Sequence, residues 1–200
     1  MDTITSDTQD TQREIEIKQA ITTILKHIGE DPTREGLQNT PDRIYRMFEE
    51  IFRGYNPDKK PRITTFTNRV HSEEMVFDSG EYYSMCEHHM LPFFGRYYFA
   101  YIPSAEGRIL GISKVARVVG YCAARLQLQE RLCKDIIDMI SEALGGTAHG
   151  FAILLRGKHM CKSMRGVRNK GEMSTVYFTG DFRKKTQLRN EFYNLVKLQG

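Results

Sequence analysis

The residues best suited to chemistry lie in one short stretch, Cys86-Glu87-His88-His89. Cys86 and His89 are three positions apart, a spacing that lets one turn present a thiolate and an imidazole to a single metal ion. Pro92 follows three residues later and helps to fix the loop. The pattern predicts a metal site, while an isolated cysteine or histidine is more often an ordinary packing or surface residue.

A third metal ligand is available in a second stretch, His159-Met160-Cys161. If this stretch is extended, the side chains of His159 and Cys161 point to the same side. Three protein ligands leave a coordination position for water, as catalytic zinc sites do and structural ones usually do not. His88 and His159 would then remain near the metal as proton carriers, which is the layout of a hydrolytic site. Spacing alone does not pair the two stretches.

Positive charge is concentrated in the second half of the chain. Residues 1–100 carry 12 basic and 17 acidic side chains, whereas residues 101–200 carry 17 and 8. The stretch 156–170 holds six Lys or Arg and no acid, so it can receive phosphates or a nucleic-acid backbone, unless it is simply a solvated loop. A helix is predicted to begin at Ser113-Lys114 and to include Arg117. Its N-terminus is either a phosphate-binding site or an ordinary helix start, with Ser113 as the N-cap beside two basic surface residues.

Gln129 and Glu130 form a candidate site for a purine base. The edge of a guanine ring presents N–H donors at N1 and N2, and one carboxylate can accept both. Glu130 beside Gln129 can therefore read that edge. The alternative interpretation is an ordinary helix surface.

The composition is that of a globular protein. The 200 residues are 40% hydrophobic and 27% charged, with a net charge of +4. The longest compact apolar run, 151–155, is far shorter than the roughly 18 residues that a membrane span needs. The N-terminus is polar and does not resemble a secretory signal. We therefore expect a cytoplasmic protein with no membrane partner. Four cysteines are too few for a disulfide scaffold, and Cys122 and Cys133 have the apolar neighbours of packing residues.

The spacing of apolar residues predicts the helices and strands that carry these side chains. Residues 1–11 are predicted to be a disordered tail, residues 12–62 an N-terminal helical region with a linker, and residues 63–200 a catalytic domain. Within that domain we expect strands near 75–85, 94–102, 150–160 and 173–181, with helices near 115–123 and 132–144 and a tail helix at the end. This order predicts an α+β fold with an antiparallel sheet.

Taken in order, these motifs resemble the GTP cyclohydrolase I family. The resemblance runs from about residue 15 to the C-terminus. It rests on NTPDRIYRMFEEIFRGY (39–55), SMCEHHMLPFFG (84–95), GISKVARVV (111–119), RLQLQERL (125–132) and HMCKSMRGV (159–167). Gly80 departs from the family pattern, because an apolar strand residue is common there, and Val176 stands where a second hydroxyl is usual.

The resemblance implies a role for each matched position. It implies Zn²⁺ held by Cys86, His89 and Cys161, with His88 and His159 as catalytic histidines. The residues implied to bind GTP are Gln129 and Glu130 at the guanine edge, and Ser113, Lys114, Arg117, Arg165 and Arg43 on the ribose–triphosphate side.

The resemblance also implies the tunnelling fold, an antiparallel sheet with two helices packed on one face, here with an N-terminal helical extension. It implies a homodecamer of two pentamers with active sites at subunit interfaces. The implied reaction converts GTP to 7,8-dihydroneopterin triphosphate and formate, the first step of tetrahydrofolate and pterin biosynthesis.

Two other functions are weighed against this one. A related tunnelling-fold enzyme would act on another pterin or deazaguanine intermediate, but the complete set of Cys ligands, histidines and Glu130 favours GTP. A non-enzymatic zinc module would bind nucleic acid through residues 156–170 and would need a fourth zinc ligand. We expect no nucleic-acid partner.

Overall fold

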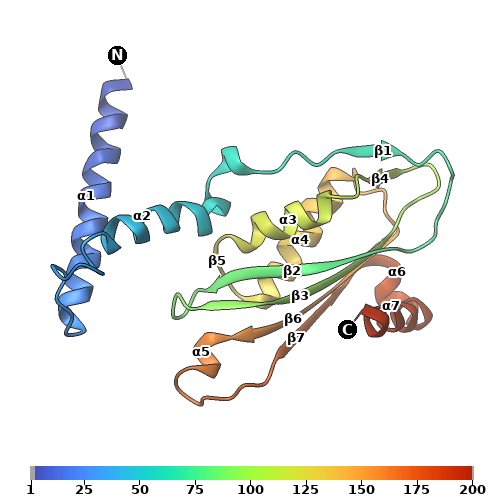
Figure 1. The fold of residues 1–200 in the computed structure, drawn as a ribbon. Helices are drawn as coiled ribbons and strands as arrows, with labels where there is room; N and C mark the ends of the chain where they lie inside the picture. Colours follow the sequence, from blue (N-terminus) through green and yellow to red (C-terminus); the bar gives the residue numbers. More distant parts are fainter. Residues whose placement is uncertain (1–2, 200) are drawn as a thin grey trace. The chain divides into compact units, whose positions relative to one another are not determined.

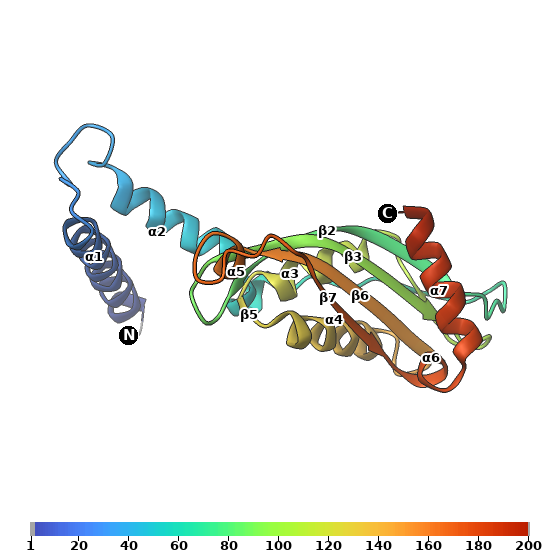
Figure 2. The same ribbon diagram turned by 90° about the horizontal axis from the view of Figure 1, so that it is seen from below.

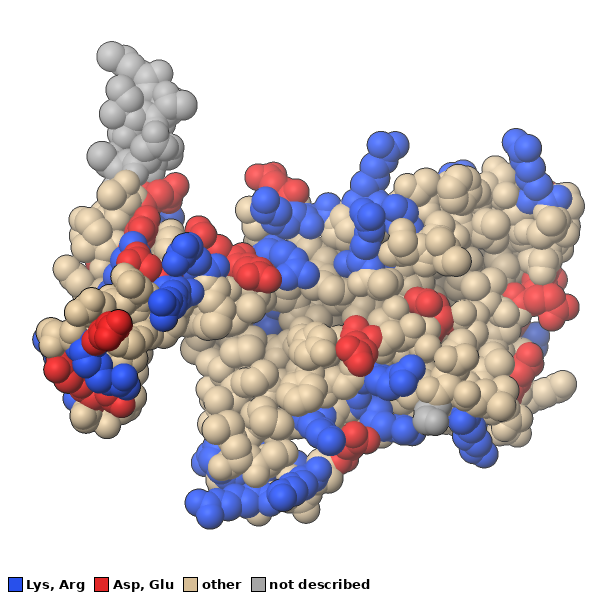
Figure 3. Space-filling view, viewed as in Figure 1, with Lys and Arg blue, Asp and Glu red and all other residues tan. Residues whose placement is uncertain are grey.

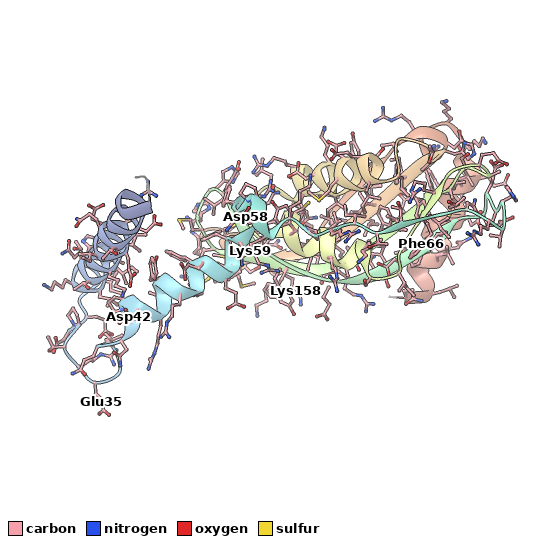
Figure 4. The ribbon with its side chains drawn as sticks, turned by 90° about the horizontal axis from the view of Figure 1, so that it is seen from above. Glu35, Asp42, Asp58, Lys59, Phe66 and Lys158 are labelled. Atoms are coloured by element: carbon pink, nitrogen blue, oxygen red, sulfur yellow. The ribbon has the colours of Figure 1, made fainter. Side chains whose placement is uncertain are left out.

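The computed structural model describes residues 3–199, with side chains from residue 10 onward, and its contacts divide the chain into two compact units, Met1–Arg53 and Gly54–Gly200 (Figure 1). The first unit contains α1 (Thr3–His27) and α2 (Thr40–Ile51). An ion pair between Lys18 of α1 and Asp42, near the start of α2, joins the two helices (Figure 4). The predicted N-terminal helical extension is therefore present.

The predicted disordered tail differs from the structure. Helix α1 begins at Thr3, so the described part of residues 1–11 is helical, and residues 1 and 2 lie outside the described residues. No glycine or proline occurs before Gly29 to interrupt the helix. Side-chain contacts at helical spacing, such as Gln12 with Glu16 and Arg13 with Asp10, support its exposed N-terminal half.

The second unit is built on a five-stranded sheet of order β5-β2-β3-β6-β7 (Figures 1 and 2). Its strands are β2 (Val76–Cys86), β3 (Pro92–Ile102), β5 (Leu126–Gln127), β6 (Gly150–His159) and β7 (Met173–Phe178). Every pairing is antiparallel except that of the two-residue β5, which runs parallel to β2. The predicted antiparallel sheet is confirmed, with this short parallel strand as an addition.

Helices cover both faces of the sheet. On one face lie α3 (Lys114–Ala123) and α4 (Gln129–Ala143), the pair that the sequence predicts. On the other lie α6 (Gly180–Lys184) and α7 (Thr186–Gln199), shown clearly in Figure 2. Both faces are buried, so β3 is almost continuously apolar: Phe99 packs on the α3 and α4 side, and its neighbours Tyr98 and Ala100 pack on the other.

The remaining elements are short. They are η1 (Arg53–Tyr55), η2 (Pro57–Lys59), a ribbon of β1 (Thr65–Thr67) with β4 (Arg108–Leu110), and α5 (Met160–Ser163). Asp58 and Lys59 of η2 and Phe66 of β1 are labelled in Figure 4. None of the helices within residues 3–199 has the length and apolar character that a membrane span requires.

The unusual Gly80 has a packing reason. A Cβ there would lie 2.7 Å from the ring of Tyr97, which crosses the strand at this point and donates a hydrogen bond to Asp78 (3.0 Å). An apolar side chain would displace that ring, so glycine is matched to Tyr97.

Candidate functional site

The predicted metal ligands converge at one end of the sheet. One ligand atom from each of Cys86, His89 and Cys161 lies within 4.8 Å of the other two. Cys86 ends β2, and the loop to β3 is closed by hydrogen bonds from Cys86 N to Leu91 O and from Met90 N to Cys86 O, both 2.8 Å. Met90 takes a left-handed conformation, with φ at +51°, which turns the chain back so that Leu91 pairs with Cys86 and the loop stays short.

Cys161 reaches the cluster by a different geometry from the one predicted. The extended geometry considered for residues 159–161 is not the one found: β6 ends at His159, and Cys161 lies in the short helix α5. The Ser163 hydroxyl donates to the His159 carbonyl (2.9 Å) and closes this turn. The sheet register brings the two stretches together, because β3 pairs with both β2 and β6, and Phe93 lies opposite His159.

The thiols of Cys86 and Cys161 are placed to bind a cation together. Burial, followed by the neighbouring Cys86 thiol, raises the pKa of Cys161 above its ordinary value. Two thiolates this close repel each other unless a positive ion lies between them. Two sulfur ligands and one imidazole form a donor set that zinc favours. Within the described residues the cluster supplies three ligands, fewer than the four of a usual structural zinc site.

Two contacts hold the ring of His159. Its ring stacks on Phe93 at a centroid distance of 4.5 Å and an interplanar angle of 8°. Its Nε2 lies 2.9 Å from Oε1 of Gln129. Burial lowers the pKa of His159, and the nearby charge of Glu130 partly opposes that change. The histidine is thus fixed in place beside the metal ligands.

His88, the other predicted catalytic histidine, is placed differently. Its side chain is 63% exposed, and its Nδ1 lies 4.0 Å from the Cys86 sulfur. Glu87, next to it, is held by Arg131, which also donates to the amide oxygen of Gln127 at 2.9 Å. The loop backbone is therefore anchored to the start of α4, while the imidazole of His88 remains accessible.

Gln129 and Glu130 begin α4, and their side chains have opposite surroundings. Gln129 is 1% exposed, and its amide nitrogen donates to the carbonyl oxygens of Leu155 (3.0 Å) and Met173 (3.2 Å). Glu130 is exposed and close enough to affect the pKa of His159. The carboxylate that we predict to read guanine is thus accessible at the metal end, and the amide of Gln129 is buried beneath it.

Arg165 contacts the cluster directly. Its Nη1 donates to Nε2 of His89 at 3.0 Å. A neutral imidazole that binds a metal through Nε2 has no lone pair left there, and one that binds through Nδ1 carries its proton on Nε2. Either coordination excludes this hydrogen bond, so metal binding at His89 must release Arg165.

The basic stretch surrounds this end of the unit. Figure 3 shows Lys and Arg side chains gathered over α5 and the loop that follows it. The exposed members of the predicted stretch 156–170 include Lys158, which is labelled in Figure 4, Arg165, Arg168 and Lys170. Anionic groups bound beside the metal ligands would therefore meet positive charge.

The other predicted phosphate ligands are not brought to the metal end. Ser113, Lys114 and Arg117 lie at the N-terminus of α3, whereas Ala123 at its C-terminus accepts a hydrogen bond from Ser84, two residues before Cys86. Ten helical residues separate the two ends by about 15 Å. Ser113 occupies the N-cap position without a capping hydrogen bond from its side chain. Arg43 lies on α2, in the first unit, beside Asn39, Asp42 and Arg46.

Sequence reasoning missed three residues that contact His159 or Gln129. They are Tyr82 on β2, Phe93 on β3 and Thr175 on β7. Phe93 falls inside the stretch quoted for the family resemblance, so its position beside the motif histidines was a usable signal. Tyr82 and Thr175 carry no local signal, because only the sheet brings them to Gln129.

Comparisons with known proteins identify the family of this chain. The family model described as GTP cyclohydrolase I matches residues 17–197. A protein of Clostridium perfringens named GTP cyclohydrolase 1 is 44% identical over 184 residues, 91% of this chain and 97% of its own length. One of the same name from Thermoanaerobacter pseudethanolicus is 46% identical over 181 residues, 90% of this chain and 95% of its own. Because the match spans nearly the whole chain, the protein belongs to the GTP cyclohydrolase I family of hydrolases.

Proposed function

We propose that this protein is a zinc-dependent GTP cyclohydrolase that converts GTP to 7,8-dihydroneopterin triphosphate and formate. The observation that carries the proposal is the convergence of Cys86, His89 and Cys161 beside His159 and Glu130. The names of the relatives and the family match support the substrate. Cys86, His89 and Cys161 would hold a zinc ion, which would supply a Lewis acid able to activate water at neutral pH.

Side chains of the protein would recognise the base, exchange protons with the purine and bind the phosphates. The Glu130 carboxylate accepts the N1 and N2 protons of guanine and so orients the base. His159 and His88 exchange protons with the purine as its five-membered ring opens and carbon 8 leaves as formate. Arg165, released from His89, contacts the triphosphate with the basic stretch around it.

The complete site needs a second copy of the chain. Ser113, Lys114 and Arg117 lie about one α3 length away from the metal ligands of their own chain. We therefore propose that a neighbouring subunit supplies them to the triphosphate, in a homodecamer of two pentamers. Arg43, on the helical unit, is proposed to contact the same phosphates.

The direct test uses purified, zinc-loaded protein and GTP. Formate release and neopterin fluorescence after iodine oxidation should both appear with the wild type. Cys161→Ala should lower zinc content and abolish turnover, whereas His159→Ala should retain zinc and lose turnover. Cys133→Ala, which removes a buried thiol outside the cluster, is the matched control and should keep both. Zinc-loaded wild type that releases no formate from GTP would refute the proposal.

A further inference from the structure

The buried amide of Gln129 has only one orientation that satisfies its partners. Its nitrogen faces three acceptors: the carbonyl oxygens of Leu155 and Met173 and the Thr175 hydroxyl, at 3.0, 3.2 and 3.0 Å. Rotating the amide by half a turn would place its oxygen against two carbonyl oxygens, with no proton between them. The amide oxygen therefore faces the other way.

Two groups face the amide oxygen of Gln129, and both must donate a hydrogen bond to it. The Tyr82 hydroxyl is 3.2 Å from the amide oxygen, and Nε2 of His159 is 2.9 Å from it. An amide oxygen accepts hydrogen bonds and cannot donate one. Nε2 of His159 must therefore carry a proton, and in the neutral ring Nδ1 is left with the lone pair.

The surroundings of the ring prevent it from turning over. Stacking against Phe93 holds its plane, and the short contact to Gln129 fixes which edge faces the sheet. Within residues 3–199, Nδ1 has no hydrogen-bond partner. Gln129 itself is 1% exposed, so its amide is not available to a ligand.

We propose that Gln129 is a positioning residue, which holds His159 as the Nε2-protonated tautomer and so makes Nδ1 the nitrogen that exchanges a proton with the substrate. This assignment rests on the proposed function for its catalytic meaning, and it replaces the expected contact between Gln129 and guanine. Base recognition then falls to Glu130, the exposed member of the pair.

The tautomer is measurable without turnover. Solid-state NMR spectra of zinc-loaded protein labelled with ¹⁵N-histidine separate protonated from unprotonated ring nitrogens, and a His159→Gln sample identifies the signals of His159. The expected spectrum has a protonated Nε2 and a bare Nδ1 at this residue. A protonated Nδ1 with a bare Nε2 would overturn the proposal, even if the protein turns over GTP normally.

A set of variants tests the role of the amide. Gln129→Met keeps the length of the side chain, and we expect it to mix the two tautomers and lower kcat about tenfold or more. The affinity for GTP, measured on metal-free protein, should stay within about twofold, since the amide contacts no substrate. Thr175→Val is the matched control: it removes one acceptor but leaves both carbonyls, so the wild-type tautomer should remain.

Glu130→Gln gives the opposite pattern. It should weaken GTP binding about tenfold or more and leave the His159 signals unchanged. If Gln129→Met instead weakens GTP binding as strongly and leaves the tautomer unchanged, Gln129 reads the base and the proposal is wrong. If Gln129→Met does not fold, the wild-type spectrum decides by itself.

Discussion

The two regions predicted to bind GTP differ in how completely one chain builds them. At the metal end, three sheet strands and two helices bring the predicted ligands, His159 and Glu130 together, and Gln129 is satisfied on every side. At the N-terminus of α3, Ser113 and Arg117 are exposed, and the Ser113 side chain makes no capping contact. The contrast is the basis for our proposal that one chain supplies the metal ligands and histidines and that another copy completes the phosphate site.

Subunit complementation is the strongest test of whether two copies of the chain form one active site. Cys161→Ala destroys the metal half of a site, and the double variant Lys114→Ala with Arg117→Ala destroys the phosphate half. Each variant should be inactive alone. When the two are dissociated and reassembled in equal amounts, about a quarter of the interfaces should combine two intact halves, and activity should return to about that fraction of wild type.

The matched control for complementation mixes Cys161→Ala with His89→Ala, which are both defective in the metal half. That mixture should remain inactive, because every interface lacks an intact ligand set. Failure of the first mixture to recover any activity, with its oligomer intact, would show that both halves of the site come from the same chain.

The four cysteines should differ in reactivity, because some are candidate metal ligands and others are buried packing residues. Burial raises the pKa values of Cys122 and Cys133 to about 12, so both thiols stay protonated near neutral pH. The pKa of Cys161 is also raised, but this side chain is only partly buried. In metal-free protein near pH 9, iodoacetamide should modify Cys161 at least about a hundredfold faster than Cys133, as peptide mass spectrometry would show.

Zinc should then protect Cys161 and leave the slow reaction of Cys133 unchanged. The rate at Cys161 should rise with pH, because the thiolate is the reacting form and its fraction grows as the thiol deprotonates. Equal rates at the two cysteines, or no protection by zinc, would count against Cys161 as a ligand.

Arg165 contacts the metal ligand His89 and is also a predicted phosphate ligand. Its substitution should have a smaller effect than the changes above. Its hydrogen bond to His89 competes with metal coordination, so Arg165→Gln should raise zinc affinity a few-fold in the absence of phosphates. Arg168→Gln removes the same charge from the same exposed loop without touching His89, and it should change zinc affinity less. Isothermal titration of metal-free protein with zinc compares the two variants, and equal shifts would mean that charge alone is responsible.

Much of the fold follows from patterns that are local in the chain. The strand predicted over 94–102 is β3, Pro92–Ile102, and the strand predicted over 75–85 is β2, Val76–Cys86, because runs rich in Tyr, Phe and Val that end at Gly or Pro are a local signal for strands. The helices predicted near 115–123 and 132–144 are α3 and α4. The described part of the predicted tail lies in α1, since polar composition alone does not separate an exposed helix from a disordered segment.

The residue types available to the site, and their spacing within each motif, are evident from the chain alone: Cys86 lies three positions before His89, and Gln129 is next to Glu130. Three further features depend on the folded chain: Cys161 joins the cluster from a helix, Gln129 turns inward to His159, and Ser113 lies at the far end of α3. The physical reason is the range of the interactions. Motif spacing acts within one turn, whereas strand register and the satisfaction of buried polar groups join residues far apart in the chain.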